Sequence, residues 1–511
     1  MIKDITLLGT SFIGNARGEG GEAVGQAVNP VNNEKLEPVY QAATEGEVAR
    51  ALELADAAFP KFSALPGGRR ADFLRAIAAG IEARMESLVA RMPLESALPE
   101  ARVRGEAGRT IGQLRMFANL IEGDAWADPR IERAEPERKP MPKPDLRSMQ
   151  VPLGPVAVFC AGNFPLAYSV AGGDTASALA AGCPVIVIAH HSHPGTAEIV
   201  ATAVAEAVKE TGMPEGVFSL LYGGGRKVGT KVVTSPVVQA VGFTGSRAGG
   251  LALMQAAADR PQPIPVFAEM SAVNPVVFLP GALEDAGAQA EAFFGSLTLG
   301  SGQFCTNPGL VFLPTDGNGQ FLDVLAKHIK AATPGVMLNP AIAEAYEKAT
   351  AAMEAHPAVS RLARADHTGA PNIAVPMVFT VAAKDFATDP ELQQEMFGPA
   401  CLIVLGDAEE TAAALDSLEG QLTASIFGAD DEIAAASGIV LRLRKLSGRL
   451  IFNGYPTGVE VCPSMVHGGP FPATSDGRST SVGTMAIHRF CRAVCWQNAP
   501  AAMLPPALRD E

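Results

Sequence analysis

The alternation of short apolar runs with alanine-rich segments between residues 155 and 258 constrains the fold of this chain most. The apolar runs are short enough for strands, and they lie at 156–159, 185–188, 218–222 and 238–243. The segments that follow them suit helices, at 169–181, 196–211 and 251–258. Strands that are apolar throughout are buried on both faces, which is typical of a parallel sheet covered by helices. The pattern predicts a doubly wound α/β domain.

A chain of 511 residues is too long for a single hydrophobic core, so two or three domains are expected. Helical spacing of apolar residues predicts helices within 49–83 and over 99–123. A second α/β region is expected from about 270 to 475. Its predicted helices are 285–300, 320–333 and 341–356, and its predicted strands are 311–313, 401–405 and 450–452.

A proline-rich segment separates the first helices from the alternating region. Residues 135–144 contain four prolines, which excludes a helix and indicates a linker or an extended arm. Near the end of the chain, residues 484–496 alternate imperfectly between apolar and polar side chains, as a strand would. We expect this segment to pair with the proline-rich arm in an assembly.

Composition and charge limit the classes of function. The net charge of −14 argues against nucleic acid or an anionic membrane as the main partner, so an acidic substrate would need a local cluster of Arg or Lys. Seven scattered cysteines do not form a disulfide pattern, and Cys491 and Cys495 lack the second Cys/His pair of a zinc site. Residues 151–160 are too short to cross a bilayer, and the first residues have no signal pattern. A cytoplasmic protein without a metal is expected.

Three residues form a candidate catalytic set. Cys305 lies in the small, polar segment Gly300–Thr306, Glu269 lies 36 residues upstream, and Asn163 precedes Phe164 and Pro165. Taken singly, each has a commoner interpretation: an inert buried thiol, a capping or ion-paired carboxylate, and a turn residue. Taken together, they supply a nucleophile, a base and an amide that can hold an oxyanion, which suits covalent attack on a carbonyl carbon.

A glycine-containing turn follows the predicted strand 238–243. Gly245, Ser246 and Gly249 precede a predicted helix, and such a turn lets backbone approach a phosphate. The three residues match only part of the dinucleotide-binding fingerprint, and no acid follows at the expected distance. On its own the segment is equally compatible with a plain tight turn.

Five motifs in this order resemble the aldehyde dehydrogenase superfamily over nearly the whole chain: Asn163–Pro165, Phe243–Ser246, Glu269, Gly302–Thr306 and Glu395–Pro399. Further segments are similar to one branch of the family, at 172–184, 192–196, 453–462 and 467–475. That branch contains α-ketoglutarate semialdehyde (2,5-dioxopentanoate) dehydrogenases and a related NADP-preferring fatty-aldehyde dehydrogenase.

The resemblance implies an NAD(P)-dependent oxidation of an aldehyde to an acid through a cysteine thioester. Cys305 would attack the aldehyde, Asn163 would hold the oxyanion, and Glu269 would activate water. The residues expected at the cofactor are Phe164, Ala189, His190, His191, Arg226, Gly245, Ser246, Glu395 and Phe397.

The resemblance also implies a division of the chain and an assembly. A Rossmann-type cofactor-binding domain would comprise residues 1–134 and 152–268, and an α/β catalytic domain would comprise 269–480. A small β oligomerisation arm would comprise 135–151 and 481–511. A homodimer or homotetramer is expected.

One position departs from the pattern of the branch. Where the branch usually has a lysine that bonds the adenosine ribose, this chain has Ile188, so a lysine substituted there should tighten cofactor binding. Three residues later His191 stands where NAD-preferring relatives often carry Glu, so nothing repels a 2′-phosphate. Arg226 could bind that phosphate or be a solvated loop charge. We expect NADP to be favoured over NAD.

The substrate expected from the resemblance is α-ketoglutarate semialdehyde, with a medium or long-chain aldehyde as the alternative. Arg102 and Arg109, on one face of a predicted helix, are candidate anchors for a carboxylate, and Tyr168 is a further candidate substrate contact. Both arginines could equally be surface charges. A third possibility, from another class of function, is a structural or binding member of the family with poor catalysis.

Overall fold

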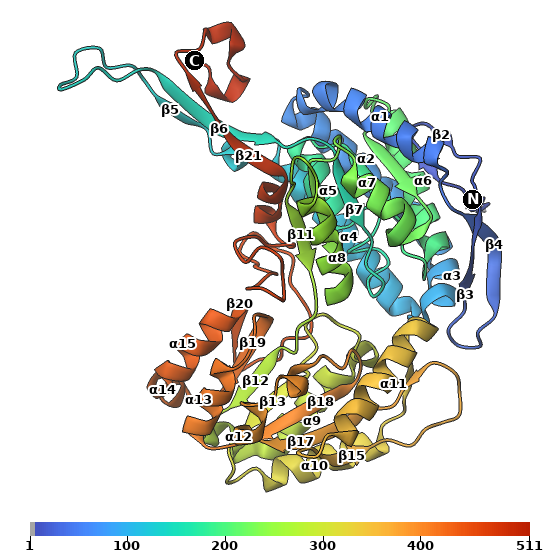
Figure 1. Ribbon diagram of the computed structural model, residues 1–511, viewed down its shortest axis with the longest axis vertical. Helices are drawn as coiled ribbons and strands as arrows, with labels where there is room; N and C mark the ends of the chain where they lie inside the picture. Colours follow the sequence, from blue (N-terminus) through green and yellow to red (C-terminus); the bar gives the residue numbers. More distant parts are fainter. Residues whose placement is uncertain (1–5, 511) are drawn as a thin grey trace.

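The computed structural model describes residues 6–510, and Figure 1 shows two lobes and a projecting arm. The first lobe contains a seven-stranded sheet in the order β11-β10-β7-β8-β9-β1-β2. Five strands run parallel, and two short strands lie antiparallel at one edge. The parallel strands are β7 (Val156–Phe159), β8 (Val185–Ile188), β9 (Phe218–Leu221), β10 (Ala240–Thr244) and β11 (Val266–Glu269), and the edge strands are β1 (Phe12–Ile13) and β2 (Ala16–Arg17).

Helices cover both faces of this sheet. Val156 and Val158 pack in one apolar cluster with residues of α2, α4, α5 and α6, whereas Ala157 and Phe159 pack in another with residues of α1, α7 and α8. The α/β doubly wound prediction is therefore confirmed. The helices are α1 (Glu45–Ser63), α2 (Gly67–Glu82), α3 (Met85–Ser96), α4 (Glu100–Leu120), α5 (Gly173–Ala181), α6 (Pro194–Glu210), α7 (Thr230–Thr234) and α8 (Arg247–Ala258).

The second lobe contains another seven-stranded sheet, in the order β15-β17-β18-β13-β12-β19-β20. Its strands are parallel except for β15 at the edge. They are β12 (Pro275–Phe278), β13 (Leu310–Leu313), β15 (Ser360–Arg364), β17 (Met377–Ala382), β18 (Ala400–Leu405), β19 (Gln421–Phe427) and β20 (Ser447–Phe452). The helices around it are α9 (Ala286–Thr298), α10 (Gly319–Ala331), α11 (Pro340–Ala355), α12 (Ala383–Phe386), α13 (Ala408–Asp416), α14 (Asp430–Ala435) and α15 (Ser437–Leu446).

The arm is a three-stranded antiparallel sheet that projects from the lobes (Figure 1). Its central strand β6 (Leu146–Pro152) pairs with β5 (Arg130–Glu132) and with β21 (Cys491–Gln497). The proline-rich segment connects β5 to β6, and residues 491–497 pair with β6 of the same chain rather than with residues 135–144. Pairing in an assembly stays a prediction. Because β5 lies before residue 135, the arm sheet begins earlier than the predicted boundary.

The strand predicted over 484–496 is wrong in its first half. Residues Thr484–Phe490 form a 3-10 helix, η6, and only Cys491–Gln497 form a strand. The reason is burial: Ala486, Ile487 and Phe490 pack into the core of the first lobe, so this segment anchors the arm to that lobe.

No helix among residues 6–510 is long and apolar enough to cross a membrane.

Candidate active site

The carboxyl ends of the parallel strands in the first lobe bring the predicted site residues together. Asn163 follows β7, His190 and His191 follow β8, Gly245 and Ser246 follow β10, and β11 ends in Glu269. In an open parallel sheet, ligands bind beyond these ends, where the strand order reverses. Here β7 has β8 on one side and β10 on the other, so the reversal lies beside the loop that carries Asn163.

The loop that carries Cys305 is held in one conformation by close backbone packing. Gly300, Ser301 and Gly302 have φ values of 57°, 57° and 67°, in the left-handed region. A Cβ atom at Gly302 would lie 2.3 Å from the carbonyl carbon of Gly398, so only glycine fits there. The glycine at position 302, part of the small and polar segment noted in the sequence, is therefore required by the backbone conformation and packing of this loop.

Asn274 fixes the backbone of the nucleophile from the opposite side. Its amide nitrogen donates to the carbonyl oxygen of Cys305 at 2.8 Å and to that of Asn307 at 3.0 Å. Its side-chain oxygen accepts from the hydroxyl of Thr423 at 3.0 Å. Every polar atom of this fully buried amide is therefore used, which makes Asn274 a positioning residue that sequence reasoning did not identify.

A cavity of about 500 Å³ joins most of the predicted residues. Its walls come from the loops after β7, β8 and β10, from the end of β11, from α11 and from the Cys305 loop. The predicted residues that line it are Asn163, His190, His191, Gly245, Ser246, Glu269, Cys305, Glu395 and Phe397. This volume is in the range of sites for small molecules and cofactors.

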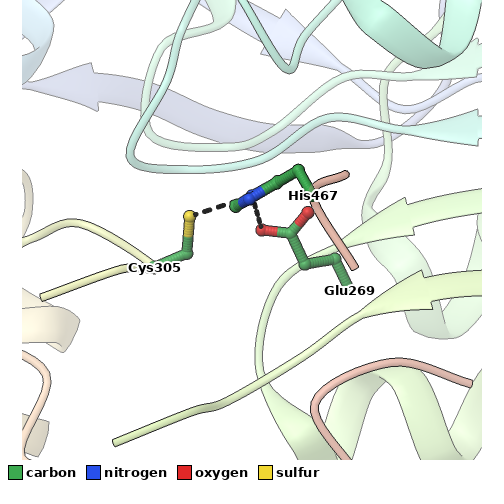
Figure 2. A group of neighbouring side chains, drawn as sticks. All are labelled: Glu269, Cys305 and His467. Atoms are coloured by element: carbon green, nitrogen blue, oxygen red, sulfur yellow. Dashed lines mark hydrogen bonds and ion pairs between the residues drawn. The ribbon is translucent and has the colours of Figure 1, made fainter. Parts of the chain in front are cut away.

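His467 lies between the thiol and the carboxylate, as Figure 2 shows. Its Nε2 atom is 3.5 Å from Cys305 Sγ and 2.9 Å from Glu269 Oε1. The hydroxyl of Ser481 donates to Glu269 Oε2 at 2.9 Å. Both Glu269 and His467 are buried, so the carboxylate depends on these two donors for its solvation.

These contacts set the proton affinities of the pair. Burial, and then the negative charge of Glu269 close by, raise the pKa of the Cys305 thiol well above its ordinary value. Burial acts to raise the pKa of Glu269 too, but the charge and hydrogen bond of His467, with the thiol and Ser481, outweigh it and hold this pKa below its usual value. The resting pair is therefore a protonated thiol beside an ionised carboxylate.

Asn163 lines the cavity near the nucleophile. Its amide nitrogen donates to the carbonyl oxygen of Gln303 at 3.1 Å, which fixes the orientation of the amide. An amide nitrogen carries two hydrogens, so one is left to donate into the cavity. The geometry suits the oxyanion role that the resemblance implies.

The opposite end of the cavity contains a turn suited to a phosphate. A Cβ at Gly245 would lie 2.7 Å from the ring of Phe243, so the site favours glycine. Without a side chain at this position, a ligand can approach the backbone of the turn. Ser246 caps α8, its hydroxyl accepting from Gly249 N–H at 3.2 Å, and the N-terminus of a helix favours an anion. Glu395 also lines the cavity, and burial raises its pKa to about 7 despite hydrogen bonds from Ser271 and Ala272.

Several predicted cofactor residues do not line this cavity. The ring of Phe164 packs edge-on against Phe304 and Tyr168, with centroids 5.6 and 5.3 Å away. Ala189 is buried in the core of the first lobe. The backbone of Arg226 lies in the π-helical turn Gly224–Gly229, but its side chain lies outside the described residues.

The surroundings of Ile188 bear on an expectation about the cofactor. Its side chain is 3% exposed and packs in an apolar cluster with Phe159, Leu221 and Val228. A lysine there would place an ammonium group among apolar side chains, which is costly. Tighter cofactor binding by Ile188→Lys stays a prediction, and it requires the lysine stem to carry its ammonium group out of this cluster.

The candidate substrate residues gather on the other side of Cys305. The guanidinium of Arg109 donates to the Tyr168 hydroxyl at 3.0 Å and pairs with no carboxylate among the described residues. The guanidinium carbon of Arg102 lies 4.7 Å from the ring centroids of both Phe164 and Phe304. The interpretation of these arginines as solvated surface charges therefore does not hold, since both side chains are largely buried against aromatic rings.

The sequence did not predict that Arg449 and His467 lie near the thiol of Cys305. Arg449, in β20, donates to the carbonyl oxygens of Pro456 and Gly458. Burial lowers the pKa of Arg449, and a charge on the Cys305 sulfur opposes that shift. His467 was noticed only as part of a branch motif. It lies 162 residues from Cys305 along the chain, and a single histidine beside glycines and proline gives no local signal of its role.

Comparison with known proteins identifies the class. The model of the aldehyde dehydrogenase family matches residues 18–479. With the fold and the Cys305–Glu269 arrangement described above, this shows that the chain belongs to the aldehyde dehydrogenase family and is an oxidoreductase.

Two curated relatives match almost the whole chain. Alpha-ketoglutaric semialdehyde dehydrogenase 2 of Azospirillum brasilense is 49% identical over 509 residues, covering 99% of this chain and 97% of the relative. Alpha-ketoglutaric semialdehyde dehydrogenase of Acinetobacter baylyi is 42% identical over 506 residues, covering 98% and 96%.

Solved structures share the fold at lower identity. A 1-pyrroline-5-carboxylate dehydrogenase superposes with a TM-score of 0.80 at 22% identity, covering 96% of this chain and 92% of that one. Aldehyde dehydrogenase C of Pseudomonas syringae, solved with NAD+ and octanal, gives 0.79 at 21% identity, covering 96% and 97%. At this identity the likeness establishes the fold.

Proposed function

We propose that this enzyme oxidises α-ketoglutarate semialdehyde to α-ketoglutarate with NAD or NADP as hydride acceptor. The observation that carries the proposal is the set of largely buried guanidinium groups beside the nucleophile. Arg109 and Arg449 have no carboxylate partner among the described residues, and each lies close enough to Cys305 for a charge on its sulfur to raise the pKa of the arginine. The two relatives of highest similarity described above are named for this substrate.

Cys305 and Glu269 supply the first step. The thiol is protonated at rest, and the ionised Glu269 carboxylate is in hydrogen-bonding contact with it. Glu269 takes the thiol proton as the sulfur bonds to the aldehyde carbon, which gives a thiohemiacetal. Asn163 donates to the oxyanion of this adduct, and preorganised donors of this kind stabilise developing charge strongly.

The same carboxylate supplies the last step. After hydride loss, the acyl group is held on Cys305 as a thioester. Glu269 first passes the thiol proton to solvent through the cavity that it lines, then takes a proton from water, and the resulting hydroxide attacks the thioester carbon. His467 and Ser481 keep the carboxylate oriented by donating to its two oxygens. The acid leaves and the Cys305 thiol is restored.

A nicotinamide dinucleotide, when bound, supplies the hydride acceptor. The residues present fit it: Gly245 and Ser246 offer a bare turn at the start of α8, and Glu395 offers a buried carboxyl to a ribose hydroxyl. His190 and His191 stack with centroids 4.4 Å apart on the cavity wall. We favour NADP because His191 brings no negative charge to the position that would face a 2′-phosphate.

The substrate-side aromatic residues complete the site. Phe164, Phe304 and Tyr168 form one apolar cluster next to Cys305, and the two arginines of α4 lie over their rings. An acidic aldehyde would place its aldehyde carbon at Cys305 and its carboxylate toward Arg109. We therefore assign Phe164 to the substrate side rather than to the cofactor.

The assembly and location are proposed from the arm and the thiols. We propose that the three-stranded arm joins subunits in a homodimer or homotetramer, since two strand edges of its sheet are open among the described residues. All seven cysteines are free, which suits the reduced cytoplasm.

The test compares aldehydes with both cofactors. Initial rates with α-ketoglutarate semialdehyde, succinic semialdehyde and octanal give kcat/KM for each in the presence of NAD and of NADP. We expect α-ketoglutarate semialdehyde to be preferred. Arg109→Met should lower its kcat/KM by about 10- to 150-fold, the loss of a charged hydrogen bond, and should spare octanal. A higher kcat/KM for octanal in the parent enzyme would overturn the substrate assignment.

Arg115→Met is the matched control. Arg115 lies on the same helix, α4, but is exposed and pairs with Glu82 on the surface. It should leave all three substrates unchanged. An equal loss in both variants would mean that the effect comes from the stability of α4.

A further inference from the structure

We propose that Cys305, His467 and Glu269 form a binding site for Zn²⁺, and that an ion bound there blocks the nucleophile reversibly. The three residues come from the loop before β13, from the segment after β20 and from the end of β11 (Figure 2). Their ligand atoms all lie within 4.8 Å of one another. Metal binding of this kind does not depend on the aldehyde chemistry proposed above.

The spacing of the three atoms suits a tetrahedral ion. With zinc–ligand lengths of about 2.3 Å to sulfur and about 2.0–2.1 Å to nitrogen or oxygen, tetrahedral angles separate sulfur from nitrogen by about 3.5 Å and nitrogen from oxygen by about 3.4 Å. The observed Sγ–Nε2 separation is 3.5 Å and the Nε2–Oε1 separation is 2.9 Å. The first fits as it stands, and the second must open by about half an ångström.

The donor set favours zinc over harder cations. A thiolate, an imidazole nitrogen and a carboxylate oxygen are ligands that zinc accepts together, whereas Mg²⁺ and Ca²⁺ prefer oxygen alone. Three protein ligands leave a fourth position for water. Cys305 and Glu269 line the 500 Å³ cavity, which gives both an entry path and room for that water.

The protons can be accounted for within the site. Nε2 must present its lone pair to the metal, so in the neutral imidazole the hydrogen must lie on Nδ1. Nδ1 of His467 is buried and has no hydrogen-bond partner among the described residues, so it is free to carry that hydrogen. Because Nε2 of His467 carries at rest the proton of its hydrogen bond to Glu269, zinc displaces two protons, that one and the proton of the Cys305 thiol, and both leave to solvent.

A second cluster provides an internal contrast. His356, Asp389 and Glu391 also bring three ligand atoms within 4.8 Å, but they are more exposed and contain no sulfur. The buried sulfur-containing site should bind zinc more tightly. Variants at the two sites therefore separate specific from surface binding.

The experiment uses Co²⁺ as a spectroscopic probe and Zn²⁺ as the competitor. Added to the reduced, metal-free enzyme, Co²⁺ should produce a thiolate-to-cobalt charge-transfer band at one ion per subunit, and Zn²⁺ should abolish it. Cys305→Ser should lack the band, and His467→Gln should weaken metal binding by more than about 100-fold, beyond the loss from a supporting residue. His356→Ala should leave the band unchanged.

A measurement on the parent enzyme avoids reliance on variants that fold poorly. Zn²⁺ should protect Cys305 from alkylation by iodoacetamide, as followed by peptide mass spectrometry, while exposed Cys495 stays reactive; EDTA should restore both alkylation of Cys305 and turnover. Absence of the charge-transfer band, an equal band in Cys305→Ser, or undiminished alkylation of Cys305 with Zn²⁺ present would overturn the proposal. The charge-transfer band and the alkylation of Cys305 do not require the enzyme to oxidise α-ketoglutarate semialdehyde.

Discussion

Glu269 is the residue on which the two halves of the proposed reaction meet. It contacts the thiol that must lose a proton, and it faces the cavity from which water must come. Its carboxylate stays ionised although it is buried, because His467 and Ser481 donate to its two oxygens. Removal of either donor should therefore change the pH at which the carboxylate takes up a proton.

His467→Gln should move the acidic limb of the kcat–pH profile to higher pH. The folded pKa of Glu269 is depressed mainly by the charge and hydrogen bond of His467 acting against burial, so without His467 the burial effect is less opposed. The active carboxylate is present above its pKa and is lost as pH falls through it. As pH is lowered, kcat of the variant should therefore begin to fall at a higher pH than kcat of the parent.

Ser481→Ala serves as the comparison for that profile, since its hydroxyl makes the smaller contribution to the Glu269 pKa. Its limb should move in the same direction by less. Superimposable profiles for the parent and His467→Gln would show that another group controls the acidic limb.

At the residue scale, the sequence predicted those site residues that lie in a recognisable local motif. Cys305, Glu269 and Asn163 each follow a strand or enter a short loop of characteristic residues, so their joint order was informative. His467 lies 198 residues from Glu269 and acts only through tertiary contact, so no local pattern identified its role. The sequence does not show that the side chain of Ile188 packs into an apolar cluster, because that depends on residues distant along the chain.

At the scale of elements, the loop before β13 decides where the thiol sits. Gly302 has a left-handed backbone and lies against the backbone of Gly398. A side chain at position 302 would therefore force one of the two backbone segments to shift. Asn274 holds the same loop from β12's leading end. The loop is thus fixed between the two neighbouring backbone segments.

Gly302→Ala should destabilise the protein by at least about 2 kcal/mol, from the left-handed backbone and the overlap with Gly398 together. It should also slow alkylation of Cys305 or turnover, because the loop must shift. Thermal unfolding and initial rates measure the two effects.

Gly295→Ala is its control. Gly295 lies in α9, and a Cβ there would meet nothing within 4 Å. A glycine-to-alanine change in an open helical position should stabilise by about 0.5–1 kcal/mol. If both variants behaved alike, the close packing at Gly302 would not control the loop.

Elements were predicted best where their residues are apolar on both faces. β7 and β8 were placed at their observed bounds, since a run of Val and Ile between turn residues leaves little choice. η6 was misassigned because its buried Ala486, Ile487 and Phe490 imitate the imperfect alternation of a strand. Only packing against α5 distinguishes the two.

At the scale of the whole molecule, the described part of the arm buries few apolar side chains, Leu504 and Leu508 among them. All three residues of β5 are exposed, and Ile131 has 38% of its surface accessible. The edge of a sheet presents unpaired backbone N–H and C=O groups, so it is suited to pairing with another chain. This is the basis on which we propose that the arm joins subunits.

Ile131→Glu should therefore shift the protein toward smaller species at a fixed concentration, as measured by sedimentation velocity, because it places a charge on the joining edge. Leu441→Glu, at a similarly exposed position on α15, should not. An unchanged distribution for Ile131→Glu would remove β5 from the interface.

The most direct test of the account is a single turnover of Glu269→Gln with α-ketoglutarate semialdehyde, followed by mass spectrometry of the quenched enzyme. An amide cannot take a proton from water, so acylation should exceed hydrolysis. We expect about one equivalent of reduced cofactor per subunit, followed by slow or no further reaction, and an acyl adduct on the peptide that contains Cys305. An adduct on another residue, or a steady-state rate equal to that of the parent, would contradict the assignment of Cys305 and Glu269.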